Sequence, residues 1–210
     1  LIGPVLKKLA NFIRPRSRFE NSTDYWEERY RNFGDSGDGS YEQLAEFKAE
    51  VLNKIIHDEN IQEVIEFGCG AGAQLALLNV EHYIGVDVSE TVLKQTKKKY
   101  EQKKPRAQLG ISLDVIYHLV EDDIFDRYMR QLFSSAGKMI IIYSSNHDEV
   151  TKFPHVRHRE FIKWVEQNCA DTWKFDRKID QRFPLQANEE NKTSFADFYI
   201  FINKRFELSV

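Results

Sequence analysis

The fold is decided by the stretch Glu63-Val-Ile-Glu-Phe-Gly-Cys-Gly-Ala-Gly-Ala-Gln-Leu-Ala-Leu-Leu-Asn-Val-Glu-His-Tyr-Ile-Gly-Val-Asp-Val-Ser89. The apolar run at residues 64–67 predicts a strand, and the glycine cluster after it predicts a tight turn. Residues 75–78 can form one helix. A second apolar run at residues 83–86 predicts another strand, which ends in Asp87. This order indicates a βαβ unit with a nucleotide-type site at its first turn.

The glycines limit what the turn can bind. Gly68 and Gly70 let the backbone bend sharply and let a ligand approach without a Cβ in the way. A helix after the turn would point free N–H groups and a positive dipole end at the ligand. Asp87 follows Gly70 by 17 positions, where its carboxylate can accept hydrogen bonds from two ribose hydroxyls. An adenosine ligand is therefore expected, unless the turn binds nothing.

Two adenosine ligands compete for this site. Residues 68–73 fit the dinucleotide fingerprint G-x-G-x-x-A. The longer pattern Glu66-Phe-Gly-Cys-Gly-Ala-Gly72 resembles motif I of the class I S-adenosylmethionine-dependent methyltransferases. Their ligand carries an ammonium and a carboxylate in place of a pyrophosphate, which suits an acidic residue at the strand end. The resemblance implies S-adenosylmethionine as cofactor, with contacts from Glu66, Gly68, Gly70, Asp87 and Val88.

Size and composition set broad limits. The chain has 210 residues, enough for one domain with a sizeable core, and its net charge of −3 does not point to a nucleic-acid partner. Cys69 and Cys169 are its only cysteines, which favours a reducing, cytoplasmic location. No apolar run approaches the ~18 residues of a membrane-spanning helix. A homodimer is compatible with these features.

The N-terminal segment has helical apolar spacing up to Pro15, accompanied by basic residues. It could lie on a membrane surface or a partner, or pack on its own domain or a dimer mate. We expect residues 1–60 to form a helical cap and residues 61–210 to form the cofactor-binding core, as one compact domain.

Residues 22–57 predict two helices, 22–32 and 41–57, around a glycine-rich polar loop. The combination of Tyr-Trp-x-x-Arg-Tyr, this loop and Leu-Ala-x-Phe-Lys resembles a bacterial group of methyltransferases often encoded beside sugar and surface-polysaccharide genes. In that group the segment is expected to cover the cofactor. The alternative is a plain surface turn. By resemblance, the candidate cofactor contacts are Tyr25, Ser36, Gly37, Ser40 and Lys48.

The next part of the chain looks too short. Ser89 can cap a helix from Glu90 to about Gln102 with a lysine-rich, solvated outer face. A doubly wound sheet then needs a third strand and a crossover. Residues 101–109 are too few to supply both before the next apolar strand at residues 110–114. We hypothesise that residues are absent near positions 105–107, which an intact mass larger than that of the printed sequence would support.

The segment Leu113-Asp-Val-Ile-Tyr-His-Leu119 resembles the family's strand-four motif. Asp114 leaves the carboxyl end of a central strand, where open α/β sheets place their ligands. If the following residues form a helical turn, Asp114 and His118 share a face, and the carboxylate would raise the pKa of the imidazole. We expect Asp114 to contact the cofactor, Tyr117 and His118 to contact substrate, and His118 with Asp114 to form the catalytic pair. The alternative is a structural histidine.

A third group follows a predicted helix at residues 121–133 and a buried strand at residues 138–143. Asn146 could orient a substrate hydroxyl or cap a turn. The loop after it could hold an anionic sugar or phosphate, or form salt bridges at a helix start. Two histidines there are too few for a metal site, so no metal is expected. The candidate substrate contacts in this loop are His155, Arg157 and His158, joined by Arg159.

Two late strands, at residues 172–180 and 194–204, predict a closing hairpin. An antiparallel last strand is expected of the methyltransferase sheet and not of a dinucleotide domain of this length. The expected fold is α/β: a doubly wound, Rossmann-like methyltransferase sheet with an antiparallel last strand and an N-terminal helical cap.

The expected function is methyl transfer from S-adenosylmethionine to a small molecule. The acceptor suggested by the resemblance is a hydroxyl of a sugar or phosphorylated sugar-like metabolite in surface-polysaccharide biosynthesis, with no nucleic acid as partner. Two other functions remain open: an NAD(P)-dependent oxidoreductase, and a catalytically inactive cofactor-binding partner protein.

Overall fold

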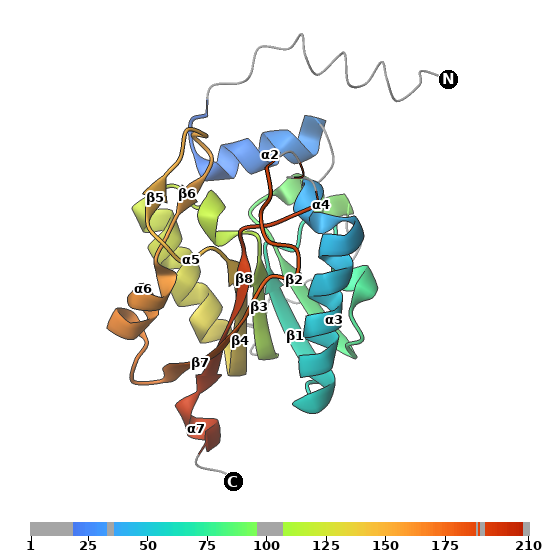
Figure 1. Cartoon of the computed structure of the whole chain (residues 1–210), viewed down its shortest axis with the longest axis vertical. Helices are drawn as coiled ribbons and strands as arrows, with labels where there is room; N and C mark the ends of the chain where they lie inside the picture. The colour runs from blue at the N-terminus through green and yellow to red at the C-terminus, as the bar shows by residue number, and fades with distance from the viewer. Residues whose placement is uncertain (1–18, 33–35, 96–106, 188, 190–191, 208–210) are drawn as a thin grey trace.

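The computed structural model describes residues 19–32, 36–95, 107–187, 189 and 192–207. A six-stranded sheet with the order β2-β1-β3-β4-β8-β7 forms its centre (Figure 1). A separate hairpin, β5 with β6, lies beside it. The strands are β1 (Glu63–Phe67), β2 (His82–Val86), β3 (Ala107–Leu113), β4 (Ala136–Ser144), β5 (Glu149–Val150), β6 (Arg157–His158), β7 (Trp173–Ile179) and β8 (Asp197–Asn203).

Helices cover both faces of the sheet and its upper edge. In Figure 1, α3 lies on one side of the strands, α5 and α6 lie on the other, and α2 crosses the top. The α-helices are α2 (Ser22–Asn32), α3 (Glu42–Asp58), α4 (Glu90–Gln95), α5 (Asp122–Ser135), α6 (Phe161–Asn168) and α7 (Lys204–Glu207); the 3₁₀ helices are η1 (Asp38–Ser40), η2 (Leu75–Leu77) and η3 (Ile116–His118).

The sheet is parallel from β2 through β4 and closes with an antiparallel strand. β1 pairs in parallel with β2 and β3, and β3 pairs in parallel with β4. β8 lies between β4 and β7 and is antiparallel to both. The predicted α/β fold with an antiparallel last strand is confirmed.

The structure after α4 only partly tests the hypothesis that residues are absent near positions 105–107. Among the described residues, no strand pairs with the outer edge of β2. The predicted helix is seen from Glu90 to Gln95, and its remaining residues lie outside the described part. The hypothesis of absent residues stays a prediction.

Alternating side chains of the strands build two cores. In β1, Val64 packs with Leu52 and Ile55 of α3, whereas Ile65 packs with Met129 of α5 on the opposite face. This alternation is the period of a strand buried on both sides. Each such fully buried aliphatic side chain stabilises the fold by roughly 2 kcal/mol.

The role of α3 bears on the predicted domain boundary. Its apolar face contributes directly to the core of the sheet, so it is more than a cover over the site. The boundary after residue 60 stays a prediction, and the basic N-terminal helix falls outside the described residues.

The helix expected directly after the glycine turn is not an α-helix. Only the three-residue η2 follows, and Leu78 is already extended with a ψ of 133°. Asn53 of α3 explains why the connection stays short: its side chain donates to the Leu77 carbonyl and accepts from the Asn79 N–H, both at 2.8 Å. So short a turn supplies little helix dipole, and the predicted dipole contribution is wrong.

Candidate functional site

Two adjoining cavities open at the carboxyl edge of the parallel strands. The first, of about 230 Å³, is lined by the ends of β1, β2 and β3 and covered by α2. The second, of about 980 Å³, extends from there to the β5–β6 hairpin. Both share the residues Trp26, Ser36, Ser40, Asp114 and His118. The predicted ligand edge of the sheet is therefore hollow, with one wall common to both spaces.

The glycine turn closes tightly beneath the first cavity. Gly70 has a φ of +51°, and a Cβ there would come within 2.4 Å of the Ser36 Oγ and 2.7 Å of the Tyr30 Oη. Its N–H donates to Asp87 Oδ2 at 2.9 Å, while Oδ1 accepts from the Ser89 N–H at 2.9 Å. Glycine is thus required both for the left-handed backbone and for the close approach of the neighbouring loop.

Asp87 is placed as a ribose-binding carboxylate would be. It follows directly after β2, lines the first cavity beside Val88, and has its pKa raised chiefly by burial. The carboxylate accepts the backbone N–H groups of Gly70, Ser89 and Val88, which leaves lone-pair capacity for a ligand hydroxyl. The residues present therefore fit the adenosine part of the predicted cofactor.

Three predicted cofactor contacts, Glu66, Lys48 and Gly70, do not line either cavity. The Glu66 carboxylate accepts the Tyr83 hydroxyl, and burial raises its pKa to about 7. The buried Lys48 ammonium donates to Asp114 Oδ2 at 2.6 Å and to the Gly39 carbonyl at 2.8 Å. Lys48 therefore acts on the site through Asp114.

The expected Asp114–His118 pair does not form. Asp114 has a φ of +60°, and η3 follows as a 3₁₀ helix in which residues three apart share a face. Tyr117 therefore lies over Asp114, and its hydroxyl donates to Asp114 Oδ1 at 2.9 Å. Together with Lys48, this hydrogen bond occupies both oxygens of the carboxylate. The four-residue spacing assumed an α-helical turn, which the backbone does not adopt.

His118 is held in another way. Its Nδ1 donates to the His155 carbonyl at 3.0 Å, and its ring meets the Trp26 ring edge to face at 4.9 Å. Burial lowers its pKa to about 4, so the expected rise in pKa is wrong. The imidazole is neutral near pH 7, with Nδ1 protonated, which leaves the Nε2 lone pair as an acceptor.

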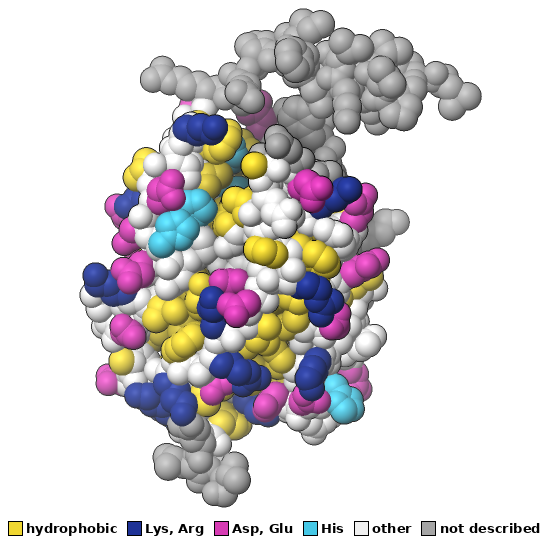
Figure 2. Space-filling model, in the orientation of Figure 1, with side chains coloured by type: hydrophobic (Ala, Val, Ile, Leu, Met, Phe, Trp, Pro, Cys, Tyr) yellow, Lys and Arg dark blue, Asp and Glu magenta, His cyan; other side chains and the backbone are white. Residues whose placement is uncertain are grey.

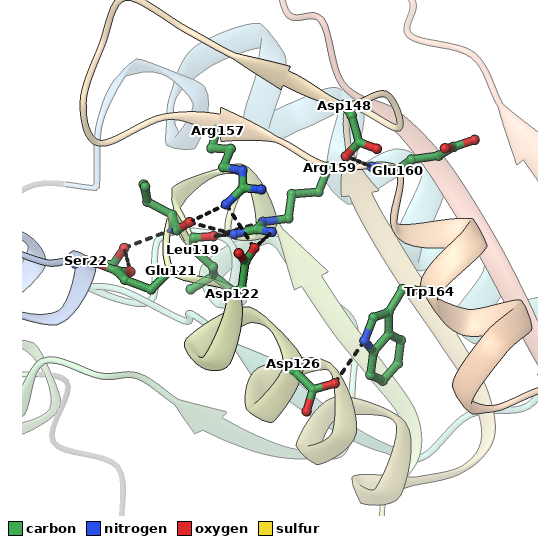
Figure 3. Close-up of polar contacts among 11 residues, drawn as sticks. Ser22, Leu119, Glu121, Asp122, Asp126, Asp148, Arg157, Arg159, Glu160 and Trp164 are labelled. Atoms are coloured by element: carbon green, nitrogen blue, oxygen red, sulfur yellow. Dashed lines mark hydrogen bonds and ion pairs between the residues drawn. The ribbon is translucent and has the colours of Figure 1, made fainter.

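Arg157 and Arg159 support the loop after β3 (Figure 3). The buried Arg159 donates to the Leu119 carbonyl at 3.0 Å and to Asp122 at 2.5 Å. Arg157 donates to Asp122 at 2.9 Å and to the Val120 carbonyl at 3.1 Å. These guanidinium groups are committed to protein acceptors and line neither cavity. The prediction that they hold an anionic substrate is not supported.

Asn146 also has a structural role. Its side-chain oxygen accepts the Ile162 N–H at 3.0 Å in the first turn of α6. It does not line the second cavity, so the turn-capping alternative describes it better than substrate contact.

Helix α2 is held over the site at its start and at its middle. Ser22 donates through its N–H and hydroxyl to Glu121 at 2.9 and 2.6 Å (Figure 3). Farther along α2, Glu27 accepts the hydroxyls of Ser89 and Thr91, which lower its pKa to about 2. The segment predicted to cover the cofactor thus contains a helix that is tied to α4 and to the loop before α5 and that lines the first cavity.

The remaining candidates line the second cavity. Tyr25 stacks on His155 with ring centroids 4.6 Å apart. Gly37, Tyr117 and His158 lie on the same wall. Several residues that line the cavities were not predicted from the sequence: Trp26, Tyr30, Arg29, Glu149 and Phe195. The aromatic spacing in residues 25–30 is a signal that could have indicated Trp26 and Tyr30.

One cluster revises the expectation about metals. The sequence prediction counts His155 and His158 and finds them too few. The structure instead places His158 beside His147 and Glu149, with ligand atoms all within 4.8 Å of one another. Sequence spacing could not show this, because the three residues meet only when the β5–β6 hairpin forms.

Comparison with known proteins assigns the class. Residues 65–135, which include the glycine turn, Asp87 and the Asp114 segment, match the family model described as "Methyltransferase domain". This stretch is similar to a methyltransferase domain. S-adenosylmethionine is its cofactor, and the predictions of this enzyme class and cofactor are confirmed.

One curated relative matches the methyltransferase domain over part of its length. It is the mouse eEF1A lysine and N-terminal methyltransferase, 30% identical over 98 residues. The match covers 45% of this chain and 14% of the mouse protein.

Solved structures share the fold. Magnesium protoporphyrin IX methyltransferase from Synechocystis PCC 6803 with bound S-adenosylmethionine covers 90% of this chain and 99% of its own, with TM-score 0.61 and 13% identity. The N-methyltransferase NodS from Bradyrhizobium japonicum WM9 with S-adenosylhomocysteine covers 88% and 100%, with TM-score 0.63 and 14% identity. The small RNA methyltransferase HEN1 covers 79% of this chain and 26% of its own, with TM-score 0.57 and 17% identity.

No helix among the described residues is long and apolar enough to cross a membrane.

Proposed function

We propose that this chain transfers the methyl group of S-adenosylmethionine to a hydroxyl of a small, sugar-like acceptor bound in the second cavity. The observation that carries the proposal is His118. Its imidazole is neutral, anchored through Nδ1, and placed on the wall common to both cavities. It can therefore take a proton from an acceptor that faces the cofactor.

The chemistry needs alignment and a proton acceptor. The bound cofactor supplies an electrophilic methyl carbon on a sulfonium. With the cofactor bound, the acceptor oxygen would take the methyl carbon as the carbon–sulfur bond breaks, and Nε2 of His118 would accept the hydroxyl proton. Trp26 and Tyr30 of the fixed α2 cover the first cavity and help to exclude water.

The walls of the second cavity favour a sugar-like acceptor. Aromatic rings such as Tyr25, Tyr117 and Phe195 offer flat apolar surfaces for the C–H face of a sugar ring. Thr193 and Ser194 also line the cavity; their hydroxyls are already hydrogen-bonded within the protein, and each keeps a lone pair that can accept a ligand hydroxyl. Arg157 and Arg159 are engaged elsewhere, but Arg29 and Lys152 line the second cavity, so its walls suit both uncharged and phosphorylated sugar-like acceptors. A role in surface-polysaccharide synthesis rests on the family resemblance.

An acceptor screen tests this proposal. Purified chain with methyl-labelled S-adenosylmethionine is given free sugars, nucleotide-activated sugars, sugar phosphates and a short RNA ending in a free ribose diol. We expect label in a sugar hydroxyl and a loss of at least tenfold in turnover for His118→Ala, whose affinity for S-adenosylhomocysteine stays near wild type. Label in RNA alone would refute the small-molecule acceptor. Cofactor binding without turnover on any acceptor would favour the inactive-partner alternative.

A further inference from the structure

We propose that His147, Glu149 and His158 bind a divalent transition-metal ion of the zinc type at the rim of the second cavity. This ligand set is separate from the residues assigned to the cofactor. Two imidazoles and one carboxylate, with donor atoms within 4.8 Å of one another, approach the spacing of ligands around a single ion.

The hairpin backbone explains why the three side chains converge. Glu149 and His158 are direct partners across the antiparallel β5–β6 pair, so their side chains leave the same face at close range. His147 precedes Glu149 by two residues, and its Nε2 already lies 3.3 Å from the Glu149 carboxylate. The rings of His147 and His158 lie side by side, with centroids 4.6 Å apart.

A buried neighbour orients one of the ligands. The Ser145 hydroxyl lies 2.6 Å from Nδ1 of His158, and both residues are buried. When Nδ1 donates to this hydroxyl, the lone pair of His158 is on Nε2, the nitrogen left to meet a metal. A hydrogen bond to the second ring nitrogen is the usual support of a metal-binding histidine.

The ligand types select the ion. Imidazole suits Zn²⁺ and its neighbours among the transition metals, whereas Mg²⁺ prefers oxygen ligands and keeps several waters. Three protein ligands leave a coordination position open, as in catalytic rather than structural zinc sites.

The open coordination position of the ion would face the second cavity. Glu149 and His158 line the second cavity together with Tyr117, whose ring lies 4.5 Å from that of His118. In Figure 2, histidine side-chain surface is exposed in the region where Figure 1 places the hairpin, so an ion can enter from solvent. The ion could hold an acceptor oxygen, a role that rests on the proposed function; metal binding itself does not.

Calorimetric titration of the chelator-treated chain with ZnCl₂ and with MgCl₂ tests the site. We expect one Zn²⁺ per chain, no comparable Mg²⁺ binding, and at least tenfold weaker Zn²⁺ binding in Glu149→Gln and in His147→Ala. Both residues have half-exposed side chains, so metal-free unfolding curves should match those of wild type. The control is His82→Ala, which removes an exposed histidine beside Glu81 on the far edge strand.

Absence of stoichiometric Zn²⁺ binding would overturn the site. So would equal affinities of wild type and Glu149→Gln, or an equal loss in His82→Ala. Visible absorption of the Co²⁺-loaded chain gives an independent reading, because intense thiolate bands would assign the ion to Cys69 or Cys169 and refute the proposed ligands. None of these results depends on methyl transfer, so the site and the proposed function can fail separately.

Discussion

Replacing Glu66 by glutamine should remove a pH-dependent loss in the free energy of unfolding. Burial raises the pKa of this carboxyl from 4.5 to about 7, although the Tyr83 hydroxyl and the Lys48 charge oppose the rise. Between these two pKa values the folded chain binds more protons than the unfolded chain, so the free energy of unfolding falls as pH increases. At about 1.36 kcal/mol per pKa unit, the total loss is about 3 kcal/mol.

The assay is urea unfolding of wild type and Glu66→Gln at about pH 5 and about pH 8. The amide can still accept the Tyr83 hydroxyl but does not titrate. We expect the stability of the variant relative to wild type to improve by about 2.5 kcal/mol between the two pH values, because part of the loss already occurs below pH 5. Comparing the two proteins cancels the contributions of other titrating groups. Identical pH dependence of both proteins would refute a buried carboxyl with a raised pKa.

Three further outcomes follow from the site. Gly70→Ala should weaken S-adenosylhomocysteine binding at least tenfold by calorimetry, because its Cβ would meet the Ser36 hydroxyl at 2.4 Å, whereas Gly137→Ala has 3.6 Å of room and should bind normally. With the pKa of His118 at about 4, the imidazole stays neutral over about pH 6 to 8, so kcat/KM should show no histidine limb there; a limb near pH 7 that disappears in His118→Ala would contradict this assignment. Lys48→Met should lower the free energy of unfolding by about 3 kcal/mol by leaving the Asp114 carboxylate without its counter-charge, against less than about 1 kcal/mol for the exposed Lys54→Met; equal losses would contradict a buried ion pair.

The sheet could be predicted from sequence because its signals are local. The apolar runs of β1, β3 and β4 are bounded by glycine or acidic residues, and the parallel order follows from the βαβ unit. The backbone turn at Asp114 could not be predicted in this way. Its left-handed φ and the 3₁₀ turn after it depend on the Lys48 and Tyr117 partners, which are supplied by tertiary packing.

The roles of charged and histidine residues were the least predictable from sequence. Arg159 looks like an anion-binding residue in a loop, yet burial makes it a support for the Leu119 carbonyl and for Asp122. A metal-binding role for His147 and Glu149 could not be predicted, because they come close to His158 only through the cross-strand register of the folded hairpin. Cofactor residues are carried by a local motif, whereas acceptor and metal residues are brought together from distant segments.

The central claim is that the cavity over Asp87 and Gly68 binds S-adenosylmethionine, and it is tested most directly by calorimetric titration with S-adenosylhomocysteine and, separately, with NAD. We predict micromolar binding of the first at one molecule per chain and no binding of the second. Binding of NAD without binding of S-adenosylhomocysteine would contradict the account and return the chain to hydride chemistry.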